Sequence, residues 1–419
     1  MSTPLTIANS LYEQQRDFAL LYSGMQTTYS GRYSYLAFDP VQTIQGNSFS
    51  ELEAHCTHHT DWHQQCWFGY MGYELAADTE KHLRLNTTPP SPISMPNMWM
   101  VKYRHIIRYD HVTNSSDYFG PDKTTIPEPS QPSTDSAFSV ANITSNMDKQ
   151  TYLTHVKTIL NAIKQGDLYQ ANLTRKWFGH FHEPPNSFAL FAKLCHISPA
   201  PYSAFLSHGD YHILSSSPER FLSVSSDGHV NTRPIKGSAK RSTNTKKDSQ
   251  IYHNLAQSEK DKAENLMIVD LMRNDLARTC EPGSIEVDKL FQVDSYATIH
   301  HMSSSINAIK SSTSSTLELI KQCFAPGSMT GTPKIKAMQL CQQLENIQRG
   351  VYSGAIGYIG ADGSCDLSVV IRTLLIHKNQ FEFQTGGAIV ADSTPNGEWA
   401  ETITKATAIC KLLNIKIDE

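Results

Sequence analysis

A run of short apolar segments separated by turn residues covers residues 352 to 391 and limits the fold class more than any other feature. Asp362-Gly363 and Lys378-Asn379 interrupt these segments, and dipeptides of this kind favour tight turns between strands. Residues 211 to 235 predict another hairpin, with its turn at Asp227-Gly228. Strands joined by short turns pair antiparallel. The sequence therefore predicts antiparallel sheet in the second half of the chain.

Helical signals lie among these strands. Tyr152, Val156, Ile159 and Ile163 recur at helical spacing, and Gly166 stands where such a helix would stop. The other expected elements are a strand from Gly166 to Phe178, one long helix from about Lys247 to Leu276, a helix opened by Thr332 as N-cap and Pro333 and running through Leu344, and a last helix from near Asn396. Helices and antiparallel strands mix without βαβ alternation, so the predicted class is α+β.

Composition and charge exclude several broad classes. The 419 residues carry a net charge of -4 and are 39% hydrophobic and 18% charged, which is typical of a globular protein. The chain shows no basic field for nucleic acid or an anionic membrane, no signal peptide, and no apolar run near the roughly 20 residues that span a bilayer. The eight scattered cysteines form no C-x-x-C pair. We therefore expect reduced thiols, a cytoplasmic location, and no nucleic-acid or membrane partner.

Two pairs of acidic residues have the spacing of a metal site. Asp261 and Glu264 lie three apart on the expected long helix, and Glu398 and Glu401 lie three apart on the last helix. Residues at this spacing share one helical face. Two such faces brought together would suit Mg²⁺, which takes one or two protein carboxylates beside an anionic substrate. The alternative is two solvated acidic faces.

Lys236 is a candidate nucleophile. It lies in the segment PIKGS at the end of an expected strand. An amine there can attack a substrate if it is kept neutral by burial and by neighbouring positive charge, for which the sequence offers Arg233, Lys240 and Arg241. The alternative is an ordinary surface lysine.

Glu219 is a candidate general acid. It lies in the segment SPER, on the strand expected to pair with the one that delivers Lys236, so the two side chains can face one site. The alternative is a surface pair between Glu219 and Arg220.

Two further features could hold carboxylates of a ligand. The segment GSMTGTPK, which contains Thr330, lacks the Gly-Lys-Ser/Thr ending of a phosphate loop, but it can present backbone N–H groups to a carboxylate. Arg372 on one strand offers a bidentate cation, and Gly386 and Gly387 on the next offer an open backbone. The alternative for Arg372 is an edge or surface position.

Together and in this order, these segments resemble the chorismate-utilising enzyme family, which includes anthranilate, aminodeoxychorismate, isochorismate and salicylate synthases. The matching segments are GDLYQANLTR, SSSPERFL, TRPIKGSAKR, DKAENLMIVDLMRNDLARTCEPGSIEV, HHMSSSI, FAPGSMTGTPKIKAMQL, YSGAIGYIGADGSCDLSVVIRTLLI and GGAIVADSTPNGEWAET. They cover roughly residues 150 to 412. LLYSGMQTTYSGRYSYLAFDP and WFGYMGYEL resemble the N-terminal part of the anthranilate and aminodeoxychorismate branch.

A few residues favour one branch of that family. Anthranilate synthases carry alanine in the motif that reads PIKGS here, whereas Lys236 is the residue of the aminodeoxychorismate branch. Isochorismate and salicylate synthases carry a lysine where this chain has Gln170. The chain departs from the family pattern at Ser238, usually threonine, and at Gly386-Gly387-Ala388, where relatives have Gly-Ser-Gly or Gly-Ala-Gly.

The resemblance implies roles for the candidate residues and a sandwich of two large antiparallel sheets with helices outside. Lys236 would add to chorismate, and Glu219 would protonate the departing 4-hydroxyl. The binding residues that it implies are Glu264 and Glu401 for Mg²⁺, Asp261 and Glu398 around that ion, and His301, Thr330, Tyr358, Arg372, Gly386 and Gly387 for chorismate.

The resemblance also implies a product, a partner and a regional organisation. The expected reaction converts chorismate and ammonia to 4-amino-4-deoxychorismate on the path to 4-aminobenzoate and folate. Ammonia is expected from a glutamine amidotransferase subunit, because the chain contains no G-x-C-x-G segment. The expected regions are an N-terminal region over 1–120 like that of anthranilate synthase component I, a linker or surface loop over 120–145 that is rich in Pro, Ser and Thr, and a chorismate-binding region over 146–415.

Three questions stay open on the sequence. The chain can instead be an anthranilate synthase component I, or an inactive homologue that only binds chorismate. In relatives the N-terminal part holds a tryptophan pocket, and Ser23, Tyr33 and Ser34 lie in the matching stretch; whether tryptophan binds here is a hypothesis.

Overall fold

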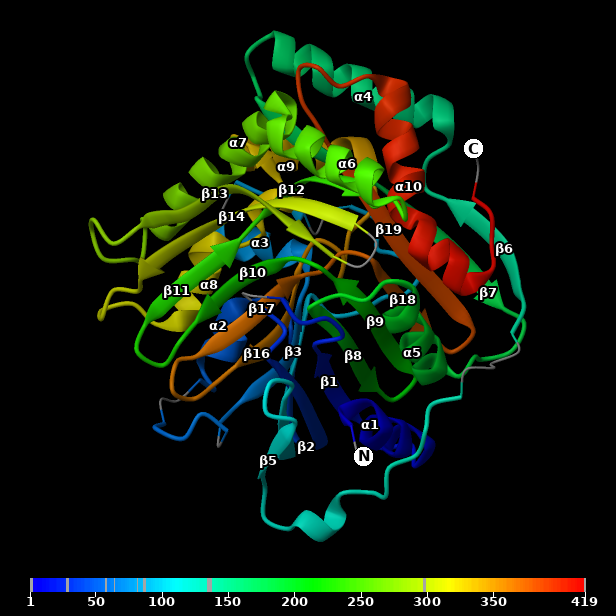
Figure 1. The fold of residues 1–419 in the computed structure, drawn as a ribbon, viewed down its shortest axis with the longest axis vertical. Helices are drawn as coiled ribbons and strands as arrows, with labels where there is room; N and C mark the ends of the chain where they lie inside the picture. The colour runs from blue at the N-terminus through cyan, green and yellow to red at the C-terminus, as the bar shows by residue number, and fades with distance from the viewer. Residues whose placement is uncertain are drawn as a thin grey trace.

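The structure is a computed structural model that describes residues 3–27, 30–56, 59–63, 65–80, 82–85, 88–133, 138–296 and 299–417. It combines a large antiparallel sheet with helices on the outside (Figure 1), so the predicted α+β class is confirmed. Positions 134–137 of the expected linker lie outside the described residues.

The strands form one continuous antiparallel ladder with two halves. The first half contains, in spatial order, β6 (Val140–Ser145), β7 (Gln170–Phe181), β19 (Gln380–Ile389), β18 (Thr373–His377), β9 (Tyr211–Ser217), β8 (Tyr202–His208) and β1 (Phe18–Tyr22). The second half contains β3 (Trp67–Met71), β16 (Ala355–Ile359), β17 (Cys365–Val369), β10 (Arg220–Val224), β11 (His229–Arg233) and β14 (Ile299–Ile309), flanked by β12 (Ile235–Lys240) and β13 (Glu286–Ser295).

Two long strands join the halves, so the two expected sheets are parts of one ladder. Strand β2 (Tyr33–Gly46) pairs with β1 and with β4 (Met98–Asp110), and β4 pairs with β3. The β2–β4 register shifts between Pro40 and Gln42, and such irregularities bend a strand and increase its twist. One buried cluster contains side chains of both halves, among them Ala204 and Leu375 from the first and Phe68 and Ile356 from the second. The halves therefore pack face to face, as the sandwich prediction required.

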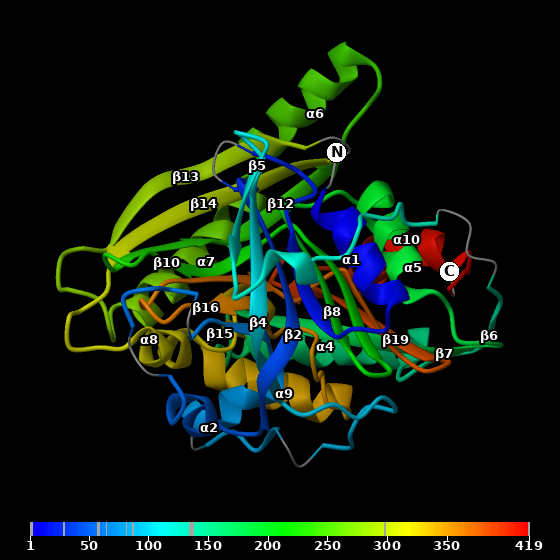
Figure 2. The ribbon, with the colours of Figure 1, turned by 90° about the horizontal axis from the view of Figure 1, so that it is seen from below.

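The helices cover the outer faces (Figures 1 and 2). On the first half lie α1 (Pro4–Glu13), α4 (Lys149–Lys164), α5 (Ser187–Ile197), α9 (Lys334–Glu345) and α10 (Pro395–Leu413). On the second half lie α2 (Phe49–Glu53), α3 (Ala76–Thr79), α7 (Glu259–Leu276) and α8 (Thr316–Cys323), with α6 (Thr245–Gln257) over β12 to β14. The remaining short elements are β5 (Ser115–Phe119), β15 (Gly331–Thr332) and the single-turn helices η1 (Tyr73–Leu75), η3 (Lys123–Thr125) and η4 (Gly327–Met329).

Two helix predictions were wrong in detail. The expected helix over 247–276 is broken at Ser258, whose side chain accepts a hydrogen bond from the Asp261 N–H and caps the start of α7. Thr332 is not an N-cap: it pairs with Gln170 in the sheet, and α9 begins only at Lys334. The three predicted hairpins are confirmed as β10–β11, β16–β17 and β18–β19.

The N-terminal region shares its sheet with the rest of the chain. Strand β1 pairs with β8, and β3 pairs with β16, so the blue strands of Figure 1 lie among later ones. The last six residues of the segment expected to be a linker, Val140–Ser145, are strand β6, because they pair with β7. Within the described residues no helix is both long and apolar enough to cross a membrane. Each of the eight cysteines, all in described segments, is unpaired.

Candidate active site

The fold brings Lys236 and Glu219 together at the start of β12. The Ile235 N–H donates a hydrogen bond to Glu219 Oε1 at 3.4 Å, and Lys236 Nζ donates to the Ser328 carbonyl at 3.4 Å. Glu219 is only 5% exposed, so the alternative of a surface pair with Arg220 is wrong. Arg220 instead forms an ion pair with Asp366 at 3.0 Å.

Strand β12 passes close to the first turn of α7. Gly237, the residue after Lys236, has φ +87°, and a Cβ there would lie 2.9–3.0 Å from Asp261 side-chain atoms. Glycine is required both for this backbone conformation and for this close approach. The PIKGS segment therefore places Lys236 beside the acidic end of α7.

Burial shifts the pKa values of both candidate residues toward their neutral forms. Burial lowers the pKa of Lys236, although the Glu264 carboxylate opposes the shift. The cation that adds to this lowering is Lys405 of α10. Burial raises the pKa of Glu219, against the opposing effects of the Ser328 hydroxyl and Lys236. A neutral amine beside a protonated carboxyl suits a nucleophile and a general acid.

The cations that the sequence suggested for this role are engaged elsewhere. Arg233 pairs with Asp294 at 2.7 Å, and Arg241 pairs with Asp248 at 2.7 Å. Lys240 is exposed. Lys405 takes their place because α10, far away in sequence, packs against the same end of the sheet.

Glu264 of α7 and Glu401 of α10 both lie near enough to Lys236 to affect its pKa. The two carboxylates and this amine influence one another's pKa values. Burial raises the pKa of Glu264, and the negative charge of Glu401 adds to the shift. Burial acts on Glu401 in the same direction, but Lys405, at 2.7 Å, outweighs it and lowers the pKa of Glu401.

Glu398 is the second candidate carboxylate on α10, and its side chain faces the backbone of β19. It is 4% exposed, its Oε2 has no hydrogen-bond partner among the described residues, and burial raises its pKa to about 7. A Cβ at Gly387 would lie 2.6 Å from this Oε2 and 3.3 Å from Glu401 Oε1. Lys405 Nζ donates to the Gly386 carbonyl at 2.9 Å. Gly387 thus lies against the α10 carboxylates with no side chain between them, whereas Gly386 contacts α10 through Lys405 and packs against β7.

The carboxylates fit an open Mg²⁺ site rather than a closed cage. Across the described part of the chain, no three His, Cys, Asp or Glu side chains gather into a metal-binding group. Mg²⁺ needs only one or two carboxylates and keeps its waters, which Glu264 and Glu401 can supply. Lysines balance these charges: Lys260 lies 3.7 Å from Glu264, and Lys405 lies 2.7 Å from Glu401.

His301 of β14 presents one free ring nitrogen. It is 2% exposed, its Nδ1 lies 2.6 Å from the Ser238 hydroxyl, and its Nε2 has no partner among the described residues. Burial holds the pKa of His301 well below its usual value, and the charge of Arg372 adds to this, so the imidazole is neutral. The hydroxyl that Ser238 retains is therefore the group that orients His301.

Arg372 and Thr330 lie at the same end of the sheet. The Arg372 guanidinium makes no hydrogen bond or ion pair with the described residues; burial lowers its pKa, and the Glu219 carboxylate opposes that shift. It is therefore available to bind an anion. Thr330 is buried, and its hydroxyl donates to the Gly327 carbonyl at 3.1 Å.

Tyr358 lies outside this site, and the tyrosine near Glu219 is Tyr352, which the sequence did not indicate. Tyr358 packs against Tyr35, with ring centroids 4.9 Å apart and ring planes tilted by 49°, and lines a separate cavity. Strand β16 runs away from Arg372, so Tyr352, just before the strand, is the tyrosine whose pKa is raised by burial and influenced by Glu219. Its hydroxyl makes no hydrogen bond with the described residues. The two tyrosines differ in their position relative to β16: Tyr352 precedes the strand, and Tyr358 lies within it.

The separate cavity has a volume of about 480 Å³ and lies between the N-terminal strands and β16. Its lining includes Ser23 and Tyr33, as well as Tyr35 and Tyr358. Ser34 does not line it: this residue is fully buried, and its hydroxyl accepts from the Ser23 N–H at 2.9 Å. The structure thus brings two of the three expected pocket residues to one cavity.

A sequence model of the chorismate binding enzymes matches residues 9–411. Aminodeoxychorismate synthase component 1 of Klebsiella aerogenes is 33% identical over 89% of this chain and 82% of its own length. The chloroplastic aminodeoxychorismate synthase of Arabidopsis thaliana is 41% identical over 66% of this chain and 30% of its own length. The chain spans about a third of the length of the plant and Streptomyces griseus relatives that it matches.

A solved structure shows the same fold. Anthranilate synthase component I of Streptococcus pneumoniae superposes with a TM-score of 0.78 at 25% identity, over 91% of this chain and 93% of that one. The family model covers nearly the whole chain, and the fold agrees with it. The chain therefore belongs to the family of chorismate-binding enzymes.

Proposed function

We propose that this chain converts chorismate and ammonia to 4-amino-4-deoxychorismate. The observation that carries the proposal is the placement of Lys236 and Glu219 together at the start of β12, a half-buried amine and a buried carboxyl that influence each other's pKa beside the carboxylates of α7 and α10. The names of the relatives from Klebsiella and Arabidopsis support it. An inactive binding protein would have no use for either residue.

The proposed chemistry divides one difficult substitution into two easier ones. The neutral Lys236 amine adds at C2 of chorismate, the ring double bond shifts, and the C4–O bond breaks while Glu219 gives its proton to the departing hydroxyl. Ammonia then adds at C4, the double bond shifts back, and the bond to Lys236 breaks. Glu219, now a carboxylate, takes a proton from the incoming ammonia. Water leaves and the enolpyruvyl group is kept.

The remaining residues bind the substrate. Mg²⁺ at Glu264 and Glu401, with Asp261 and Glu398 nearby, would bind the ring carboxylate and stabilise charge on the ring. Arg372 offers its guanidinium to the enolpyruvyl carboxylate, with the backbone of Gly386 and Gly387 and the phenol of Tyr352 close by. The imidazole of His301 faces the ring through Nε2.

The proposal includes a partner. A glutamine amidotransferase subunit would supply the ammonia, and the component 1 designation of the Klebsiella relative supports a two-subunit enzyme. A cytoplasmic location stays a prediction, supported by the eight unpaired thiols.

Product identification tests the proposal. The chain is incubated with chorismate, Mg²⁺ and an ammonium salt at alkaline pH, and the products are identified by mass spectrometry. Formation of 4-amino-4-deoxychorismate supports the proposal. Anthranilate plus pyruvate would assign the chain to the tryptophan pathway instead, and unchanged chorismate would leave only a binding function.

Removal of a metal carboxylate should raise the Mg²⁺ requirement. We expect Glu264→Gln to increase the Mg²⁺ concentration for half-maximal activity by at least about tenfold, because one of two charged ligands is lost. Calorimetric titration with Mg²⁺ in the absence of chorismate should show the same weakening. Asp270→Asn, on the exposed face of α7 at 63% exposure, is the control and should match the wild type. An unchanged Mg²⁺ titration in Glu264→Gln would remove this residue from the site.

We further propose that the cavity near Ser23 binds tryptophan. The cavity of about 480 Å³ is large enough for an indole, and Tyr33, Tyr35 and Tyr358 form an aromatic wall. Equilibrium dialysis with labelled tryptophan is expected to show one bound molecule per chain, displaced by excess unlabelled tryptophan. Dialysis without retained label at millimolar tryptophan would exclude the site.

A further inference from the structure

One short segment lies beside both reactive side chains. The Ser328 carbonyl of η4 accepts the hydrogen bond of Lys236 Nζ at 3.4 Å. The Ser328 hydroxyl is buried, makes no hydrogen bond with the described residues, and lies near enough to the Glu219 carboxyl to lower its pKa against burial. Ser328 is itself 6% exposed. A shift of this segment therefore moves both the hydrogen-bond acceptor of Lys236 and a hydroxyl group that lies beside Glu219.

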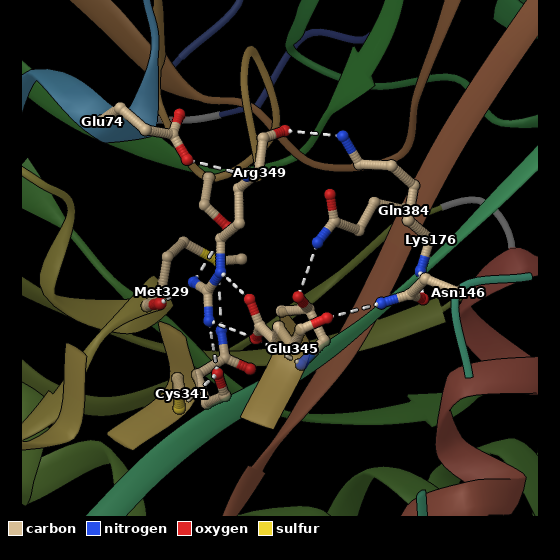
Figure 3. A network of polar contacts seen from close by, with 11 residues as sticks. Glu74, Asn146, Lys176, Met329, Cys341, Glu345, Arg349 and Gln384 are labelled. Carbon is tan, nitrogen blue, oxygen red and sulfur yellow. Dashed lines mark hydrogen bonds and ion pairs between the residues drawn. The ribbon is translucent and has the colours of Figure 1, made fainter. Parts of the chain in front are cut away.

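Arg349 holds this segment from behind (Figure 3). Its Nη1 donates to the carbonyl of Met329, the residue after Ser328, at 2.8 Å. Its Nη2 donates to the carbonyl of Asn172 on β7 at 2.7 Å. The Met329–Thr330 segment is also joined directly to β7, since the Asn172 N–H donates to the Thr330 carbonyl at 2.8 Å. Arg349 thus ties the segment to the strand that forms the other side of the site.

The guanidinium is fixed on its remaining sides. Glu345 accepts from Nε at 2.8 Å and from Nη2 at 2.7 Å, and both side chains are 2% exposed. The ring of Tyr73 lies 4.4 Å from the guanidinium carbon. The Glu74 carboxylate accepts the N–H groups of Arg349 and Gly350 at 2.8 and 2.9 Å. The side chain and backbone of Arg349 are therefore both held, and Figure 3 shows Glu74, Glu345 and Met329 around it.

Stability alone does not account for this arrangement. A buried ion pair is commonly no more stabilising than apolar side chains of the same volume. The planar guanidinium does what an apolar pair cannot: it donates to one carboxylate and two carbonyls at fixed angles. Lysine, a single point of charge on a flexible chain, can keep the ion pair with Glu345 but cannot also reach both carbonyls in this geometry.

We propose that Arg349 is a positioning residue: through the Met329 and Asn172 carbonyls it sets where Ser328 presents its carbonyl to Lys236, beside the Glu219 carboxyl. The inference deepens the proposed function and rests on the roles given there to Lys236 and Glu219. Arg349 acts only through Ser328 and is not proposed to contact the substrate.

Two substitutions separate positioning from stability. Arg349→Lys keeps a charge for Glu345 and loses the two carbonyl contacts. Glu345→Gln breaks the ion pair and leaves Arg349 its own bonds to Met329 and Asn172. We expect Arg349→Lys to lower kcat for chorismate consumption by about ten- to a hundredfold with a much smaller change in KM, since misplacement by about 1 Å at a reacting centre costs this much. Glu345→Gln should lose less activity, even where its unfolding temperature falls as far.

The control is a matched arginine outside the site. Arg16 donates from Nε and Nη2 to Asp39 and from Nη1 to the Thr125 carbonyl at 3.1 Å, and it contacts none of the segments that carry the site. Arg16→Lys should leave kcat unchanged. All variants are compared at equal folded fraction, measured by thermal unfolding.

Chorismate consumption and product identity are both measured. The proposed product and the proposed role of Arg349 can therefore be refuted independently of each other. A wild type that forms anthranilate refutes the proposed product, while the order of the variants still tests the role of Arg349. A kcat loss that merely follows unfolding temperature across Arg349→Lys, Glu345→Gln and Arg16→Lys would overturn the positioning role. So would wild-type kcat in Arg349→Lys. If Arg349→Lys does not fold, Glu345→Gln decides: the proposal requires it to retain most of its kcat per folded molecule.

Discussion

Lys236→Ala is expected to stop the formation of 4-amino-4-deoxychorismate, with a loss of at least about a thousandfold in kcat, because removal of a covalent nucleophile closes the two-step route. The structure supports a large effect, since no other amine is positioned in the same way: among the described lysines near the site, Lys405 and Lys260 are engaged with Glu401 and Glu264. The measurement is chorismate turnover with mass spectrometry of the products. Residual turnover is expected to give anthranilate, because ammonia can still attack C2 directly.

The matched control lies on the same strand. Lys240 is exposed at the end of β12, and Lys240→Ala removes the same side chain without entering the site. It should retain wild-type kcat. Wild-type product formation in Lys236→Ala, at an unchanged unfolding temperature, would show that the lysine is not the nucleophile and would return Glu219 to the role of sole reactive group.

Glu219→Gln should lower kcat by about a hundred- to ten-thousandfold, the usual contribution of a general acid. Burial raises the pKa of Glu219, so the protonated carboxyl is favoured, and glutamine copies its shape while it can give no proton to the leaving hydroxyl. A group whose pKa is raised on folding costs stability above its unfolded pKa. The unfolding temperature of Glu219→Gln near pH 7 is therefore expected to be equal to or higher than that of the wild type.

Binding and stability measurements show which step fails. Chorismate affinity, measured by calorimetry with Mg²⁺ present, should change little in Glu219→Gln, because the residue acts on the leaving group. Glu259→Gln, at an exposed position of α7 (87% exposed), serves as the control. Retained kcat with weakened chorismate binding would make Glu219 a binding residue and not an acid.

The local features of the fold and of the site could be predicted from the sequence alone. Hairpins at Asp227-Gly228 and Asp362-Gly363 depend on the two residues of each turn, and the class follows from such turns and from helical spacing. Lys236 and Glu219 were found because each lies in a segment whose pattern is itself informative, PIKGS and SPER, whereas His301 came only from the family resemblance. The pairs Asp261–Glu264 and Glu398–Glu401 could be predicted as shared faces, since spacing along a helix is a local property.

Only the tertiary structure decided which of these features meet. The partner cation of Lys236 is Lys405, 169 positions later in the sequence, and not one of its sequence neighbours. Tyr352 replaced Tyr358 near Glu219 because of the direction of β16, and Ser34 turned away from the cavity that Ser23 lines. The continuity of the ladder depends on the bend in β2. The hydrogen bond from Arg349 to the Met329 carbonyl joins residues that are 20 positions apart in the sequence. Local patterns are encoded within a few residues, whereas pKa shifts and shared contacts depend on burial and on charges that the chain brings together only when it packs.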